Sequence, residues 1–380
     1  MKKYSYSCLA VFLSLFFSTN SFSQPTPTTK AEAIPLGCSS TRYSIVNLGY
    51  LDNVNPYSNG SKLNNLGNAV GTSNVQPYSG HAFYYTNNGG MQDIHPNNTD
   101  IYYSNAKSIN DRNHIVGAGA VANSAGSSNA VFYYDQQTVQ IIARSESPEF
   151  IDPVSINAKN QILLNRSNYS QAVPVFNSYV WQNGQSILTF DANGRPFYSK
   201  AMNNNRVVVG EVYSPAYIAK GFVWQNGQLR VLGALENNDN IRAGANNLNN
   251  NSNLIVGYSE KTLLPLSTLR RPVYWVKNNT GEYVIRDILN NSSTNEGVAY
   301  AVNNQQMIVG EMSVQHGSDR HAFLHKISTN ELIDLRTVVD NLGSRVLEVA
   351  QDINDQCQIL VNGRDAQGHY EAFRLDPINN

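Results

Sequence analysis

An apolar residue followed by asparagine recurs seven times along the chain at nearly constant intervals. These asparagines are Asn64, Asn110, Asn157, Asn203, Asn249, Asn303 and Asn354, and the steps between them are 46, 47, 46, 46, 54 and 51 residues. After most of them come a polar turn, an apolar pair with glycine, and an aromatic segment that holds all three tryptophans of the chain. A repeat of about 48 residues must stack on its neighbours, because one copy cannot bury its own apolar surface.

The copy that contains Asn203 indicates how the unit folds. Its predicted strands are residues 199–202, 206–213, 221–224 and 229–232. Asn226-Gly227 predicts a tight hairpin turn, and no segment of comparable length has the 3.6-residue period of a helix. Small residues recur in the first strand and Phe, Tyr or Trp in the third, as expected for blades that converge on an axis. We therefore predict an all-β, seven-bladed β-propeller with four-stranded antiparallel blades.

The two ends of the repeat array are incomplete in complementary ways. Residues 46–51 match a fourth strand, but no first three strands precede them. The last copy stops after a third strand that reaches Leu375. We expect the N-terminal strand to close the last blade, because this pairing hides two strand edges that would otherwise be open to aggregation.

His-Ala-Phe at 81–83 and 321–323, together with the Ile-Asn and Val-Gly elements, resembles the HAF repeat of exported bacterial proteins. The resemblance covers roughly residues 42–377, and it implies export and a repeat architecture. His81 and His321 share one position at the start of the third strand. An edge hydrogen bond or aromatic packing is the role expected for them, ahead of metal ligation or acid–base chemistry.

The N-terminus predicts export independently. Lys2 and Lys3 precede an apolar run at 9–17, and small residues follow, so residues 1–23 read as a secretory signal peptide. We assign residues 24–41 to a flexible leader and residues 42–380 to a single propeller domain. The apolar run is too short for a membrane span. The mature chain keeps 25 basic and 28 acidic residues without a basic stripe, which argues against nucleic acid. The protein is expected to be a secreted monomer, with the periplasm as an alternative location.

Cys38 and Cys357 are the two cysteines that remain after cleavage of the signal peptide. Cys357 is expected in the turn between the first and second strands of the last blade. Cys38 is expected just before the strand that closes the same blade. The separation of first and fourth strands, roughly 14 Å, can be spanned by extended residues 39–43. We predict a disulfide, with two isolated thiols as the alternative.

We predict a ligand-binding protein with no catalytic residue, no cofactor and no metal site. Gly117-Ala118-Gly119 belongs to the repeat and is followed by no helix, so it is not a dinucleotide-binding turn. The long connections all lie on one face, and their tyrosines offer flat, amphipathic contact area to an extracellular glycan or protein. The predicted ligand-binding residues are Tyr57, Tyr78, Tyr169, Tyr213, Tyr217 and Tyr258.

The alternative function is that of a hydrolase or lyase acting on extracellular polysaccharide. Cleavage of a glycosidic bond usually needs two acids that face one bond. The candidate acids, expected in connections from fourth to first strands, are Glu146, Glu149, Asp152, Glu236, Asp239 and Glu296. Two or more carboxylates in one pocket, or a histidine with a carboxylate, would favour the enzyme over the binding protein.

Overall fold

The computed structural model describes most of the chain after the predicted signal peptide. The described residues are 36–76, 79–97, 100–122, 128–170, 174–264, 267–290, 292, 295–313 and 319–378. They all belong to one compact unit. The predicted signal peptide and residues 24–35 of the predicted leader lie outside them, and the described part of the leader begins with the short 3-10 helix η1 (Leu36–Ser39).

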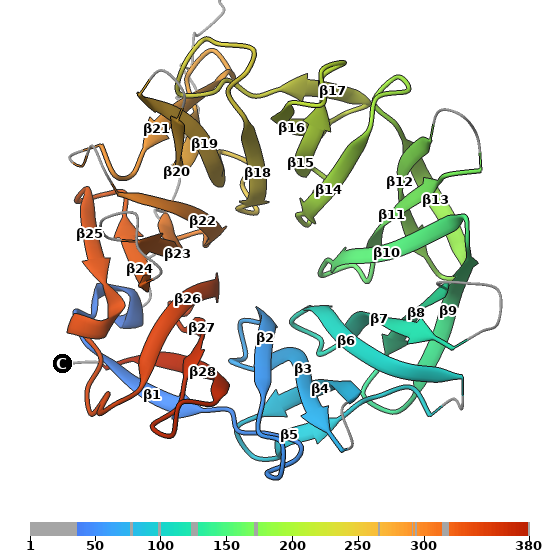
Figure 1. Ribbon diagram of the computed structural model, residues 1–380, viewed down its shortest axis with the longest axis vertical. Helices are drawn as coiled ribbons and strands as arrows, with labels where there is room; N and C mark the ends of the chain where they lie inside the picture. The colour runs from blue at the N-terminus through green and yellow to red at the C-terminus, as the bar shows by residue number, and fades with distance from the viewer. Residues whose placement is uncertain are drawn as a thin grey trace, which may run out of the picture. The chain divides into compact units, whose positions relative to one another are not determined.

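Seven four-stranded antiparallel sheets surround a central axis, as Figure 1 shows. In the first six blades the strands follow chain order, with the first strand innermost. Blades one to three are β2–β5 (Ser58–Leu63, Ala69–Val75, Ser79–Thr86, Gly90–Asp93), β6–β9 (Ile101–Ile109, Ile115–Val121, Ser128–Tyr134, Val139–Glu146) and β10–β13 (Glu149–Ile156, Ile162–Asn168, Val175–Gln182, Gln185–Phe190). Blades four to six are β14–β17 (Phe197–Met202, Val208–Tyr213, Ala219–Gln225, Gln228–Val231), β18–β21 (Ala243–Leu248, Leu254–Leu264, Ser267–Lys277, Tyr283–Asp287) and β22–β25 (Glu296–Val302, Met307–Ser313, Arg320–Lys326, Glu331–Asp334).

The seventh blade joins the two ends of the chain. Its strands from the axis outward are β26 (Val346–Ile353), β27 (Ile359–Arg364), β28 (Tyr370–Pro377) and β1 (Tyr43–Asn47). The predicted propeller and its closure by the N-terminal strand are confirmed, since β1 pairs antiparallel with β28. A second 3-10 helix, η2 (Leu335–Thr337), follows the sixth blade.

Several predicted strand bounds differ by a few residues from those of the structure. The closing strand is Tyr43–Asn47 rather than 46–51. The second strand of blade four begins at Val208, because Arg206 has a φ of +59° and belongs to the preceding turn.

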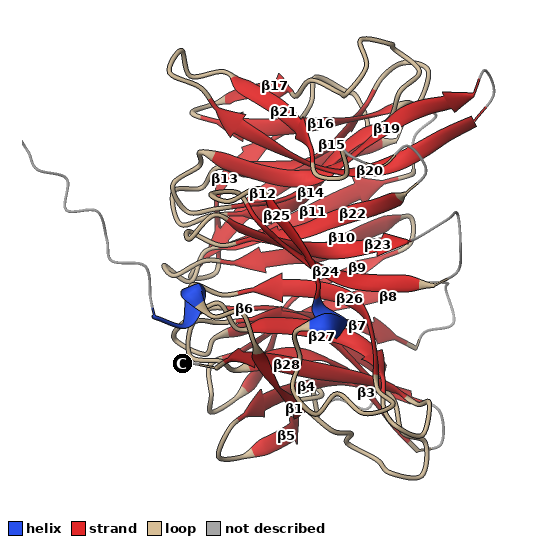
Figure 2. Ribbon diagram, turned by 90° about the vertical axis from the view of Figure 1, so that its left-hand side faces the viewer, coloured by secondary structure: helices blue, strands red, loops and turns tan. Residues whose placement is uncertain are grey.

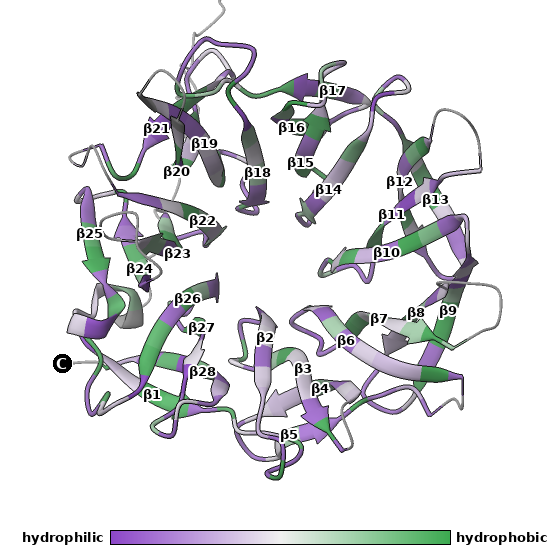
Figure 3. Ribbon diagram, in the orientation of Figure 1, coloured by the Kyte–Doolittle hydropathy of each residue, from purple (hydrophilic) through white to green (hydrophobic). Residues whose placement is uncertain are grey.

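The core consists of apolar layers between neighbouring blades. Each of the seven buried clusters joins residues of two adjacent blades, and the cluster that contains Leu63 and Ala372 joins the first blade to the seventh. Figure 3 shows the apolar residues on the strands and mostly hydrophilic connections between them. This arrangement explains why one repeat could not fold alone.

The repeated Val-Gly step follows from close packing inside each blade. A Cβ placed on Gly310 would lie 2.0 Å from the carbonyl oxygen of Val298 and 2.8 Å from the ring of Phe323, so no side chain fits. Phe323 is the phenylalanine of the second His-Ala-Phe motif and is completely buried. The glycine of the second strand therefore makes room for the phenylalanine of the third.

A β-bulge interrupts every first strand at the same place. The extra residues are Ser61, Lys107, Val154, Lys200, Asn246, Tyr300 and Gln351, and all seven line the central cavity. A bulge bends its strand and re-aims a side chain. Here it presents one side chain from each blade to the axis.

The seven repeat asparagines are all buried, and each begins the turn between the first and second strands. In blade two, the backbone carbonyl of Asn110 accepts a hydrogen bond from the Asn113 amide (3.0 Å). The Oδ1 atom of Asn110 accepts hydrogen bonds from the amides of Arg112 (3.0 Å) and His114 (3.1 Å). The third residue after each asparagine has a positive φ; these residues are Gly67, Asn113, Asn160, Arg206, Ser252, Gln306 and Cys357. Each turn is thus held by its own asparagine.

The same asparagines also connect neighbouring blades. Their Nδ2 atoms donate to the carbonyl of the next repeat asparagine at six of the seven interfaces, at 2.9–3.5 Å. The bond from Asn354 to Asn64 closes this ring at 2.9 Å. At the remaining interface, between blades five and six, Asn249 Nδ2 donates instead to Asn253 Oδ1 (2.6 Å).

A second ring of hydrogen bonds lies one residue further along each turn. There the backbone amide donates to the side-chain oxygen of the equivalent residue in the next blade, again at six interfaces. The ring is open where the acceptor would be Ala158, which has no side-chain oxygen. Because the two rings are open at different interfaces, every interface keeps at least one of the two bonds.

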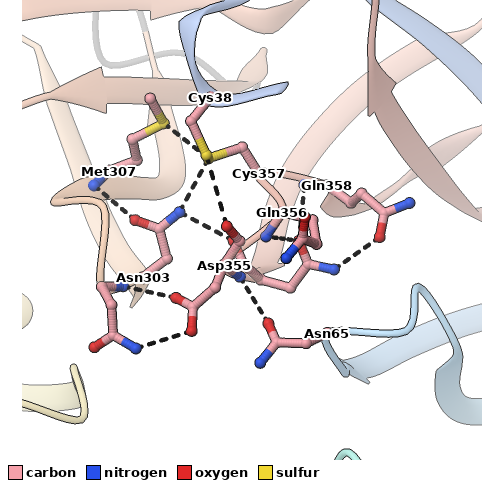
Figure 4. The surroundings of a disulfide bond; sticks show 10 residues. Cys38, Asn65, Asn303, Met307, Asp355, Gln356, Cys357 and Gln358 are labelled. Carbon is pink, nitrogen blue, oxygen red and sulfur yellow. Dashed lines mark hydrogen bonds between the residues drawn. A yellow bond between two sulfur atoms is a disulfide. The ribbon is translucent and has the colours of Figure 1, made fainter. Parts of the chain in front are cut away.

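The predicted disulfide is confirmed. Cys38 and Cys357 are joined, with their Cα atoms 5.2 Å apart, and both are buried. Figure 4 shows the disulfide beside the ring of asparagines, where Asn303 Nδ2 lies 3.3 Å from Cys357 Sγ. The bond ties the segment before β1 to the first turn of the blade that β1 completes.

The two histidines of the His-Ala-Phe motifs hold the end of the fourth strand. His81 Nδ1 lies 2.8 Å from Asp93, and His321 Nδ1 lies 2.7 Å from Asp334. Burial alone would raise the pKa of Asp93, but hydrogen bonds from His81 and from the His95 amide leave it below its usual value. The expected edge hydrogen bond is confirmed for both histidines.

Replacing Asn203 with alanine should lower the free energy of unfolding by about 2–4 kcal/mol, because the amide of Asn205 and the buried amide of Val207 lose their acceptor and the bond to the next blade is lost. Asn53→Ala, on an exposed connection, is the matched control and should change stability by less than about 0.5 kcal/mol. Denaturant titration measures both variants. Equal stabilities for the two would show that the ring does not hold the blades together.

Replacing both cysteines with alanine should lower the free energy of unfolding by up to about 5 kcal/mol, because the disulfide closes most of the chain into one loop. A reductant should weaken the wild-type protein and leave the double variant unchanged. Peptide mass spectrometry of the oxidised protein should find the two cysteines linked. Two free, alkylatable thiols would contradict the disulfide.

Candidate functional site

The two faces of the propeller carry connections of different kinds. Turns between first and second strands and between third and fourth strands lie on one face, and the longer connections lie on the other, because adjacent strands are antiparallel. Figure 2 shows η1 on one side and the end of β19 on the other. We call the side on which β19 ends the long-connection face.

A groove of about 610 Å³ lies on this face between blades three and four. Five aromatic side chains and three prolines line it: Tyr169, Phe176, Tyr198, Tyr213, Tyr217, Pro174, Pro196 and Pro215. We call it the aromatic groove. Tyr169 follows β11, whereas Tyr217 lies in the connection before β16. The antiparallel order of the strands brings these connections of two neighbouring blades side by side.

Contacts between the rings fix the shape of the groove. The ring centroids of Tyr169 and Phe176 are 6.0 Å apart, those of Phe176 and Tyr198 5.6 Å, and those of Tyr198 and Tyr213 6.2 Å. All three pairs are edge-to-face, the arrangement that aromatic rings favour. The rings therefore form a continuous surface that exists before any ligand arrives.

Two of the tyrosines are well exposed. Tyr217 is 71% exposed and Tyr169 is 46% exposed. Tyr217 also has a φ of +58°, a conformation that is uncommon for a bulky side chain. Its amide donates to the Ser214 carbonyl at 2.8 Å, which closes the turn that holds it. Backbone outliers of this kind cluster at ligand-binding sites.

The groove carries little charge. Arg195 is the one ionic side chain among its described lining residues. Burial, followed by the hydrogen bond with Tyr169, raises the pKa of Tyr198, and burial with the nearby Glu211 raises the pKa of Tyr213. These hydroxyls therefore stay protonated at neutral pH, where each can donate or accept a hydrogen bond.

The structure brings three of the six predicted tyrosines together. Tyr169, Tyr213 and Tyr217 share the aromatic groove. Tyr57 lines the central cavity instead, and its ring centroid is 6.0 Å from that of Tyr370. Tyr258 is buried in β19 beneath the guanidinium of Arg270, and Tyr78 lies outside the described residues.

Sequence reasoning missed the strand residues of the groove because it considered the connections alone. Phe176 and Tyr198 each lie next to the first residue of their strand, beside the long-connection face. In β14 the alternation of Phe197 and Tyr198 sends the first ring into the core and leaves the second at the groove. This alternation was visible in the sequence, but the pairing of blades three and four was not.

The predicted acids do not form one site. Glu146, Glu149, Asp152 and Glu296 lie within strands rather than in connections, because β9 and β10 extend to the Ser147-Pro148 turn and β22 begins at Glu296. Glu149 pairs with Arg166, and Glu236 accepts a hydrogen bond from Thr262 Oγ1 (2.7 Å).

One of these acids lines a second groove, of about 530 Å³, between blades five and six. Glu296 lies there with Glu260, Glu311, Arg270 and Arg320. We call it the acidic groove. Among the described residues, no group of three or more His, Cys, Asp or Glu side chains could hold a metal ion, and no helix could span a membrane.

No protein-family model matches the sequence, and no curated protein matches it significantly. Several solved structures share the fold at low identity. An oligogalacturonate lyase in complex with manganese is 10% identical with a TM-score of 0.53, and the match covers 89% of this chain and 98% of that one. Prolyl endopeptidase is 10% identical with a TM-score of 0.53, and the match covers 90% of this chain and 48% of that one. TolB from Acinetobacter baumannii is 10% identical with a TM-score of 0.41, over 82% of this chain and 80% of that one. At such identities the likeness shows the β-propeller fold alone.

Proposed function

We propose that this protein is an exported, non-catalytic β-propeller that binds an extracellular glycan in the aromatic groove. The observation that carries the proposal is the convergence of exposed, mutually packed tyrosines from two blades. Export rests on the N-terminal pattern and the resemblance to the HAF repeat. The Cys38–Cys357 disulfide agrees with it, because such bonds persist in oxidising compartments.

Sugars suit this groove better than charged ligands do. Tyrosine rings present an apolar face and a polar hydroxyl, which match the CH faces and hydroxyls of a sugar ring. The rings are already held by one another, so binding costs little side-chain entropy. A proline-rich peptide could use the same ring faces, and it is the protein alternative that an experiment must separate from a glycan.

Replacing Tyr217 or Tyr169 with alanine should weaken glycan binding about tenfold, corresponding to about 1.4 kcal/mol per ring. Tyr102→Ala removes a 60% exposed tyrosine that does not line the groove and should leave binding unchanged. An array of glycans and peptides identifies the ligand, and isothermal titration then compares the variants. A peptide as the sole ligand would contradict the proposal that the ligand is a glycan. Loss of binding in Tyr102→Ala alone would contradict the proposal that the ligand binds in the aromatic groove.

The acidic groove favours a second candidate function, cleavage of a polysaccharide. Three carboxylates in one groove meet the condition expected for an enzyme. However, Glu311 already accepts a hydrogen bond from the Tyr300 hydroxyl (2.8 Å) and pairs with Arg320 (3.2 Å). Glu296 accepts a hydrogen bond from Ser313 Oγ at 3.4 Å. Glu260 accepts a hydrogen bond from the Arg242 amide at 3.2 Å. Since all three acids are engaged within the protein, we place binding ahead of cleavage.

If the acidic groove cleaves polysaccharide, incubation with the glycan bound by the protein should yield shorter products. Glu296→Gln should then slow their formation at least 100-fold, because an amide cannot transfer the proton. Glu282→Gln, at an exposed position, is the matched control. Chromatography of the products measures the rate, and unchanged glycan after long incubation would leave binding as the sole function.

A further inference from the structure

The central cavity carries charge of one sign. It has a volume of about 590 Å³, and the charged residues among its described lining are Lys62, Lys107 and Lys200. It opens toward the long-connection face, since Tyr57, just before the first strand of blade one, also lines it. The described part of the chain places no carboxylate in this lining, although the whole protein has a formal charge of −1.

The cavity at the opposite end of the axis is lined by carboxylates. It is a narrower cavity of about 160 Å³ formed by the asparagine turns, and Asp111, Asp352 and Asp355 line it. Lys62 lies between the two cavities and is ion-paired with Asp352 at 2.7 Å. Its charge is therefore already balanced.

Lys107 and Lys200 are the lysines whose charge remains available. Both are bulge residues, so the fold aims them at the axis from blades two and four. Lys107 makes no ion pair with a described residue, and Lys200 has a distant partner, Glu211, at 3.7 Å. The charge of Lys107 lowers the pKa of Asp152 against the larger effect of burial, but these two described residues form no ion pair.

A neutral hydrogen-bond donor lies in the blade between those that carry these two lysines. Ser155, in blade three, lines the cavity, and its buried hydroxyl has no hydrogen-bond partner. A buried polar atom without a partner costs free energy, which a ligand oxygen would recover. Two lysines of like charge around one cavity also repel each other unless an anion lies between them.

We propose that the central cavity binds an anion, a carboxylate or a phosphate group, between Lys107 and Lys200 and beside the Ser155 hydroxyl. The volume lies within the usual range for small-molecule sites, so the anion can be one group of a larger ligand. The site is separate from the aromatic groove and does not depend on the function proposed for it.

Two probes separate the possible sources of the anion. A trimer of galacturonic acid supplies carboxylates, inorganic pyrophosphate supplies phosphates, and a neutral galactose trimer is the uncharged control. Isothermal titration with the full mature protein should detect binding of at least one anionic probe that added salt weakens. Any binding of the neutral trimer belongs to the aromatic groove and should not change with salt. Binding of the uronate alone assigns a sugar acid, and binding of pyrophosphate alone assigns a phosphate.

Lys107→Gln/Lys200→Gln should weaken binding of the anion at least tenfold, and the corresponding double arginine variant should retain it. Lys159→Gln/Lys261→Gln removes the same charge from exposed positions outside the cavity and should bind as the wild type does. Thermal unfolding checks that all variants are folded. Failure of both anions to bind, or equal weakening by the two glutamine variants, would overturn the proposal, and neither result bears on the aromatic groove.

Discussion

The hydrogen bonds of the repeat asparagines connect neighbouring blades at six of the seven interfaces, and the ring depends on them. One amide side chain closes its own turn through Oδ1 and reaches the neighbouring turn through Nδ2. An aspartate in its place could not donate the second bond, and an alanine could make neither. Six of the seven asparagines have this double role, which explains why asparagine recurs along the chain while the residues around it vary. The apolar layers between blades supply the burial, and the asparagines fix how the blades meet.

The scaffold and the candidate sites lie at opposite ends of the blades. The asparagine turns and the disulfide occupy the short-turn face, where the repeat asparagines and the two cysteines have structural partners. The long connections carry no such constraint, so neighbouring blades can differ there. Blades three and four form an aromatic groove on this face, and blades five and six form an acidic one. Blades of the same strand order therefore carry different side chains on this face.

The bulges of the first strands link the packing inside each blade to the lining of the central cavity. A bulge in the first strand leaves one residue unpaired, and the carbonyl two residues before it lies close to the glycine of the second strand, as at Val298 and Gly310. The unpaired residue points to the axis. The bulge, which is present in all seven blades, therefore decides which side chains, such as Lys107 and Lys200, line the central cavity.

The spacing of the asparagines determined the number of blades, and the missing strands at the two ends determined how the ring closes. These features are local or periodic, so one sequence displays them. The candidate sites required the tertiary structure, because they depend on which blades are neighbours and how far each connection extends. Tyr169 and Tyr217 share a groove, whereas Tyr57 and Tyr258, which looked equivalent in the sequence, lie at the axis and inside a blade. Residue type shows what a side chain can do, and packing between blades decides which side chains can do it together.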